Sequence, residues 1–140
     1  MSKFSAFLSG NVEKIENQKL VVSNRFKENG KPVEWEIRAL TSEENDEIQR
    51  QAMVNVPVPG QRGTFTRELD QIKYTGLLLA ASVVFPDLNN AELQDSYGVK
   101  TPVALLKKML YANEEGLLAK KVMALSNIEE LPDLVNEAKN

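Results

Sequence analysis

The sequence of 140 residues contains no cysteine and no histidine. Without cysteine the chain has no disulfide framework, no thiolate nucleophile and no cysteine-ligated zinc or iron–sulfur cluster. Histidine is the commonest metal ligand and the usual general base near neutral pH, so its absence removes most of the remaining catalytic chemistry. Carboxylate-based acid–base or metal chemistry and a lysine nucleophile are what remain. The two absences argue against an enzyme and predict no cofactor.

The sequence also lacks a basic stripe and a long apolar run. The formal net charge is −3 and the lysines are scattered among acids, so we expect no binding to nucleic acid. The longest apolar run, 76–85, is about half of the ~20 residues that span a bilayer. The first ten residues are too short and too polar for a signal peptide. We therefore expect one cytosolic globular domain, without a membrane partner.

One stretch, PDLNNAELQDSYGV (86–99), concentrates acidic residues and raises the question of a metal site. Read as a calcium loop that begins at Asp87, it places Glu92 where a sharp turn requires glycine. The bidentate glutamate of such a loop would fall on Gly98. Read as an acid pair, Glu92 and Asp95 lie on one helical face with nothing apolar nearby to raise a pKa. Neither reading supports a site.

A joint between two helices explains the same stretch fully. Pro86 ends the preceding helix, and Asn89 or Asn90 caps a short helix over 91–97. Gly98 then supplies the left-handed residue that terminates it.

Two segments near the N-terminus, 19–26 and 33–40, alternate in polarity with the period of a half-buried strand. Asn29-Gly30 between them is a strong signal for a two-residue hairpin turn. This turn fixes the predicted register of a hairpin over 19–40: Phe26 opposite Val33, Asn24 opposite Trp35, Val22 opposite Ile37 and Leu20 opposite Ala39.

The pattern changes after the hairpin. Thr41 and Glu44 form a capping box, which predicts a helix over 42–53. The next residues, VNVPVPGQRGTFT (54–66), contain two prolines and two glycines, so we expect an exposed, mobile linker loop. Its apolar side chains are candidates for partner binding: Val54, Val56, Val58 and Phe65. The alternative is a loop folded back over the core.

Further helices are predicted over 69–85, from Thr101-Pro102, from Asn113 as a cap, and over 131–139. The fold class that follows is α+β: an N-terminal β-hairpin and a mainly α-helical bundle of about five helices, with the helical region at 67–127. Phe4, Phe7 and Leu8 lie at helical spacing near the N-terminus. They either dock on the core or bind a partner.

Three segments carry a family resemblance: VVSNRFKENGKPVEWEIRALTSEEN, AASVVFPDLNNAELQDSYGV and LLKKML. With the order of elements around them, they resemble the XkdN-like family of phage tail assembly chaperones over about 11–126. The shared motifs are structural rather than catalytic, so they indicate a family without indicating a site.

The resemblance implies a non-enzymatic assembly factor that binds the tape measure protein and assists tail tube assembly. The major tail tube protein is a second implied partner, and self-association stays open. Such a protein acts in the host cell cytoplasm and is absent from the mature virion. One alternative is a structural tail or head–tail connector protein that stays in the virion. The other is a magnesium-dependent enzyme in which Asp70, Asp87, Glu92 and Asp95 would have to converge.

A slippery heptamer such as A AAA AAC encodes Lys-Asn after a codon that ends in A. The chain ends Ala138-Lys139-Asn140, and an alanine codon can end in A. Chaperones of long-tailed phages are often made in a short form and a longer, frameshifted form. If the gene carries such a heptamer at this place, this chain is the short form of two; a polar terminus without significance is the alternative.

Overall fold

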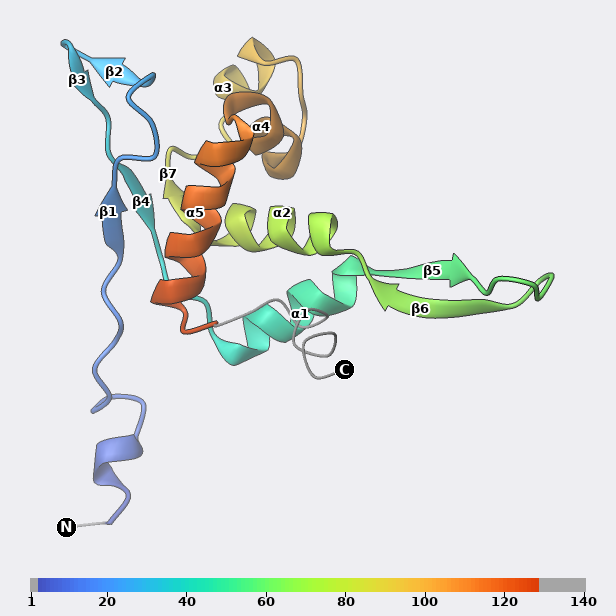
Figure 1. Cartoon of the computed structure of the whole chain (residues 1–140). Helices are drawn as coiled ribbons and strands as arrows, with labels where there is room; N and C mark the ends of the chain where they lie inside the picture. Colours follow the sequence, from blue (N-terminus) through green and yellow to red (C-terminus); the bar gives the residue numbers. More distant parts are fainter. Residues whose placement is uncertain (1–2, 129–140) are drawn as a thin grey trace.

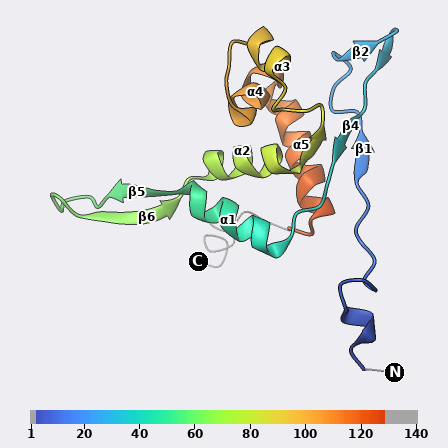
Figure 2. The ribbon, with the colours of Figure 1, turned by 180° about the vertical axis from the view of Figure 1, so that it is seen from behind.

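A computed structural model describes residues 3–128, so the predicted helix over 131–139 and the last three residues lie outside the described part. After the short 3-10 turn η1 (Ser5–Phe7), a three-stranded antiparallel sheet stands beside a group of helices (Figures 1 and 2). Its order is β1 (Gln18–Leu20), β4 (Trp35–Ile37), β7 (Val83–Phe85). The helices are α1 (Ser42–Ala52), α2 (Gln71–Ser82), α3 (Ala91–Ser96), α4 (Pro102–Met109) and α5 (Ala112–Leu125).

The expected α+β class is met only in part, because strands recur along the chain instead of ending with the N-terminal hairpin. The helix predicted over 69–85 is shorter than expected. Its last three residues form β7, which pairs with β4 and completes the sheet. Val83 and Val84 are β-branched, and such side chains favour a strand over a helix. The sequence did not distinguish helix from strand here, because a continuous run of apolar residues shows neither the helical period nor the strand period.

The predicted hairpin is correct near its turn and wrong beyond it. Strands β2 (Lys27–Glu28) and β3 (Lys31–Pro32) flank Asn29 and Gly30, both with positive φ, as a two-residue turn requires. Farther from the turn, Leu20 lies opposite Trp35 and not Ala39, and Val22 does not pair with Ile37. The register has shifted by four residues. Because four is even, Leu20 stays on its predicted face of the sheet.

The Val33 N–H still donates to the Phe26 carbonyl at 2.7 Å, so Phe26 keeps its predicted partner. The shift arises because residues 21–25 leave the ladder, and the contacts of Arg25 show what holds them. The Arg25 guanidinium binds the Glu114 carboxylate through two of its nitrogens and donates to the Met109 carbonyl at 2.8 Å. It also lies over the rings of Phe26 and Tyr111, 4.9 and 4.6 Å from their centroids. The extra residues therefore tie the hairpin to the junction of α4 and α5.

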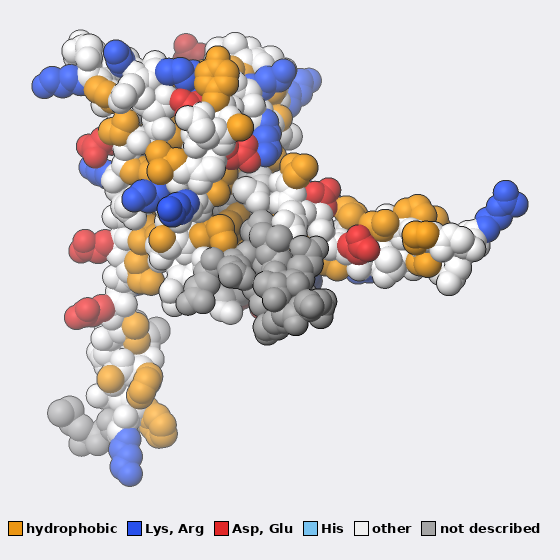
Figure 3. Space-filling view, viewed as in Figure 1, with side chains coloured by type: hydrophobic (Ala, Val, Ile, Leu, Met, Phe, Trp, Pro, Cys, Tyr) orange, Lys and Arg blue, Asp and Glu red, His pale blue; other side chains and the backbone are white. Residues whose placement is uncertain are grey.

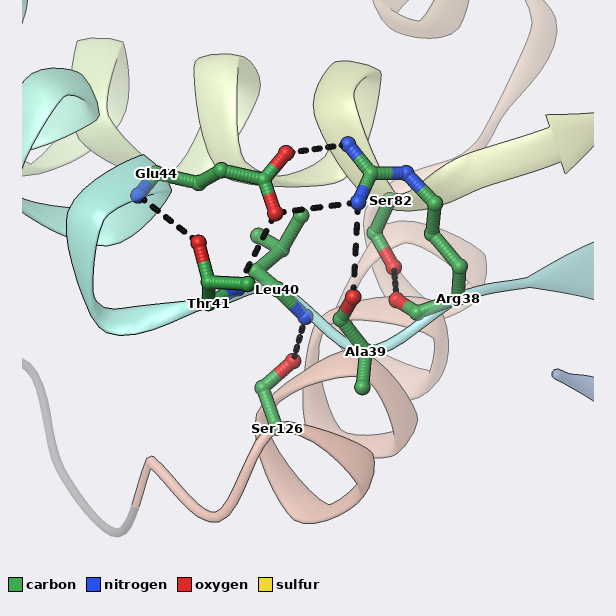
Figure 4. A network of polar contacts seen from close by, with 7 residues as sticks. All are labelled: Arg38, Ala39, Leu40, Thr41, Glu44, Ser82 and Ser126. Carbon is green, nitrogen blue, oxygen red and sulfur yellow. Dashed lines mark hydrogen bonds and ion pairs between the residues drawn. The ribbon is translucent and has the colours of Figure 1, made fainter. Parts of the chain in front are cut away.

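A polar network joins the sheet to α1 (Figure 4). Arg38 forms a two-pronged ion pair with Glu44, and the Ser82 hydroxyl donates to the Arg38 carbonyl at 2.6 Å. The predicted capping box is confirmed: the Thr41 hydroxyl accepts from the Glu44 N–H, and the Glu44 carboxylate accepts from the Thr41 N–H. The Leu40 N–H donates to the Ser126 hydroxyl at the end of α5.

The caps of the later helices were mostly predicted correctly. Asn90 caps α3, and Thr101 caps α4 with Pro102 at its first position. After α3, Gly98 has φ +69° and the Val99 N–H donates back into the helix, as expected. Asn113 was the wrong cap: α5 begins after Tyr111, whose N–H donates to the Glu114 carboxylate at 2.8 Å.

The linker predicted over 54–66 is mostly a β-hairpin. Strand β5 (Met53–Pro57) continues directly from α1, and β6 (Phe65–Leu69) leads into α2. Only 58–64 connect the two strands. Prolines and glycines suggested a loop, but Pro57 lies at the end of a strand on the edge of a two-stranded ribbon, where the missing N–H costs no ladder hydrogen bond.

The core is centred on α2. Tyr74, Leu78 and Leu79 are buried on this helix, and they share one apolar cluster with Trp35 and Ile37 of β4. Gly76 allows α4 to approach: a methyl group at this position would lie 2.8 Å from Cγ1 of Val103. That is too close for two carbon atoms.

We predict that Gly76→Ala destabilises the protein by ~1–3 kcal/mol through overpacking, although alanine favours a helix by about 1 kcal/mol. Val103→Ala removes the clashing methyl groups, so Gly76→Ala in that background should be neutral or stabilising. Urea denaturation of the four proteins in a double-mutant cycle measures the coupling. An equal effect of Gly76→Ala in both backgrounds would contradict a clash with Val103.

The Glu114 carboxylate predicts a pH dependence. The Arg25 guanidinium, then the Ser23 hydroxyl and the Tyr111 N–H, lower its pKa from 4.5 to about 2. A lowered pKa in the folded state stabilises the fold above pH 4.5, and this stabilisation is lost as the pH falls toward about 2.

We expect Glu114→Gln to lower the thermal midpoint at pH 7, because Arg25 loses its charged partner. The midpoint of this variant should also fall less steeply between pH 4.5 and pH 2 than that of the wild type. Glu92→Gln, which removes an exposed carboxylate on α3, is the matched control. If the thermal midpoints of Glu114→Gln and wild type changed with pH in parallel, the Arg25–Glu114 ion pair would not contribute to the pH dependence of folding stability.

Candidate partner-binding site

The most prominent surface feature is the hairpin arm, defined as β5, β6 and their connection 58–64. It projects from the point where α1 ends and α2 begins, clear of the rest of the molecule (Figures 1 and 2). Hydrophobic side chains lie along it (Figure 3). A two-stranded ribbon without a packed face is marginally stable in water, so this arm is a candidate for contact with another molecule.

The register of the arm divides the predicted site residues between its two faces. Val54 lies opposite Glu68 and Val56 opposite Thr66. Since alternate residues of a strand share a face, Val54 and Val56 are on one side, and Val58 continues that row. Phe65 lies opposite Pro57 and therefore on the other side. The three valines are half-buried, whereas 60% of Phe65 is exposed. The structure thus brings the valines together and separates them from Phe65.

A second apolar feature is the N-terminal segment, defined as residues 3–17. It runs away from the sheet in the direction opposite to the β2–β3 turn (Figure 1). Phe4, Phe7 and Leu8 are 69, 78 and 55% exposed, so they do not dock on the core. Val12 and Ile15 in the same segment are also exposed and were missed by sequence reasoning. Their three-residue spacing among polar residues was the available signal.

A shallow groove of about 380 Å³ lies between the β2–β3 turn and the start of α3. Its lining is largely apolar and includes Phe26, Val33, Phe85 and Leu93, with the buried Trp35 ring also in contact with it. This groove could not be read from the sequence because it depends on β7: Phe85 is half exposed only because the chain leaves α2 before reaching it.

Two of the four acidic residues considered for an enzyme have structural roles. Asp70 caps α2 by accepting from the Lys73 N–H at 3.0 Å, and Asp87 accepts from the Asn89 N–H at 3.0 Å. Across residues 3–128, no group of three or more acidic side chains is arranged to hold a metal ion. No helix in that part of the chain has the length and apolar character to cross a membrane.

Comparison with known proteins gives these surfaces a context. Residues 4–139 match the family described as the phage XkdN-like tail assembly chaperone protein, a longer match than the 11–126 expected from the sequence. The phage-like element PBSX protein XkdN of Bacillus subtilis (strain 168) is 27% identical over 139 residues, which cover 97% of this chain and 93% of that protein. YqbN of the same strain is 28% identical and covered to 92%.

The fold is shared as well. A crystal structure of YqbN superposes with a TM-score of 0.76 at 21% identity, covering 92% of this chain and 99% of the other. The family match extends over nearly the whole chain and includes the hairpin arm and most of the N-terminal segment. The expected resemblance is confirmed: this chain belongs to the XkdN-like family of phage tail assembly chaperones.

Proposed function

We propose that this chain binds the tape measure protein of its phage and keeps it soluble until the tail tube assembles around it. The observation that carries the proposal is the pair of projecting segments with exposed apolar side chains in a member of this chaperone family. A tape measure protein is long and helical and exposes apolar faces before the tube covers it. Apolar side chains on an accessible arm are suited to cover the apolar faces of such helices reversibly.

Within the arm, we assign the main contact to the valine face, defined as Val54, Val56 and Val58. These side chains form one row on a strand, and their half-exposed state leaves area to bury on binding. The N-terminal segment, with Phe4, Phe7 and Leu8, supplies a second contact from another side of the molecule. Two separated weak contacts on one chain raise the overall affinity while each stays reversible.

The proposal includes where the chain acts. It works in the host cell cytoplasm during assembly, has no catalytic role, and is absent from the mature virion. The major tail tube protein is a second partner, which the chaperone helps to recruit. The alternative of a structural tail or connector protein predicts the opposite distribution: mass spectrometry of purified virions would detect this chain at the copy number of a structural component.

We expect the tape measure protein to stay soluble when it is co-expressed with this chain and to precipitate without it. Val56→Asp should reduce co-purification at least about tenfold, since burying an unpaired carboxylate against an apolar helix is unfavourable. Asn55→Asp adds the same charge at the neighbouring position on the opposite face and is the matched control.

Equal solubility of the tape measure protein with and without this chain would overturn the proposed function. Equal binding by the Val56→Asp and Asn55→Asp variants would instead overturn the assignment to the valine face. Circular dichroism of both variants establishes that they are folded.

A further inference from the structure

The hairpin arm has two edges that differ chemically. The Val58 N–H donates to the Thr64 carbonyl, and the Asp70 N–H donates to the Ala52 carbonyl. Because hydrogen-bonded pairs alternate in an antiparallel ladder, Thr66 and Glu68 also direct their backbone groups toward β5. Phe65, Arg67 and Leu69 direct theirs outward.

Only one of these edges is protected. On β5 the outward position at Pro57 lacks an N–H, and Pro59 follows it, so this edge cannot extend the ladder toward the tip of the arm. The β6 edge has no proline. Among the described residues, the outward N–H and carbonyl groups of Phe65, Arg67 and Leu69 have no backbone partner. An open edge of this kind is a template for one more strand.

We propose that the β6 edge pairs with the β6 edge of a second copy of this chain, antiparallel, with a two-fold axis at Thr66. In this register Thr66 lies opposite Thr66 of the second copy, and Phe65 lies opposite Arg67 of the second copy. The arrangement is isologous, so each contact occurs twice.

Side-chain chemistry disfavours two of the other registers. A shift that centres the pair on Arg67 places two guanidinium groups opposite each other, and one that centres it on Glu68 does the same with two carboxylates. Like charges directly opposite destabilise a sheet. With Thr66 at the centre, two hydroxyls meet and each Arg67 faces an aromatic ring, which are both favourable cross-strand pairs. The same register aligns Arg62 at each tip with Asp70 at the base of the other arm.

The pairing resolves two weaknesses of the isolated arm. It converts two marginal ribbons into one four-stranded sheet, and it removes the open edge. Paired residues of an antiparallel sheet share a face, so the valine faces of both copies join on one side around Thr66. The two helical bodies lie at opposite ends of this sheet, since each arm projects clear of its own body (Figures 1 and 3).

The absence of cysteine makes this pairing directly testable. Thr66→Cys places the two introduced thiols in a non-hydrogen-bonded pair, with Cα atoms ~4.5 Å apart, a separation that a disulfide can bridge. We expect mild oxidation of this variant to give a covalent dimer. Thr64→Cys, two residues away on the same face, lies opposite Glu68 of the second copy and should stay uncrosslinked. Equal crosslinking of both variants, or crosslinking of Thr64→Cys alone, would overturn the register.

A charge complementation experiment tests the pairing without a covalent bond. Thr66→Glu and Thr66→Lys each place like charges on the two-fold axis, so each variant should dissociate at concentrations at least about tenfold higher than the wild type. An equimolar mixture should restore the dimer as a heterodimer, which sedimentation velocity and native mass spectrometry resolve. Restored association also shows that the single variants are folded. A wild-type chain that sediments as a monomer at every concentration, or a mixture that associates no better than its components, would refute the proposal.

Discussion

The burial of β4 is the constraint on which the rest of the structure depends. Trp35 is 2% exposed and Ile37 is fully buried, and full burial of such side chains contributes roughly 1.5–3 kcal/mol each. A three-residue strand achieves this only with β1 and β7 on its two edges and helices against it. The chain must therefore leave α2 at Ser82 to supply β7, and that early exit exposes Phe85 and opens the groove beside it.

Two arginines connect the segments on either side of β4 to the helices. Arg25, which lies between β1 and β2, binds the junction of α4 and α5. Arg38, which directly follows β4, binds the start of α1. Their acid partners, Glu114 and Glu44, both have a pKa lowered to about 2, mainly by the bound guanidinium. The same two carboxylates also accept N–H groups at the starts of α5 and α1. Each therefore serves helix capping and tertiary contact at once.

Local signals in the sequence predicted local structure well. The Asn29-Gly30 turn, the Thr41 capping box and the termination at Gly98 each depend on residues a few positions apart, and all three are present. The failures involve distant contacts. The four-residue shift at Leu20 is held by Arg25 and Glu114, which are 89 positions apart, and β7 exists because β4 needs a second neighbour. For the partner-binding residues, composition indicated exposure, but only the strand register separated Phe65 from the valines.

The hairpin arm closes at its base, where the Asp70 N–H donates to the Ala52 carbonyl at 2.9 Å. The two ends of the arm thus meet at a hydrogen bond between the last residue of α1 and the residue that caps α2. Loop-closure entropy grows slowly with length, so residues added or removed beyond this point change the stability of the body little. The arm is accordingly the part of this fold that can lengthen or shorten at the least cost to the helical body that carries it.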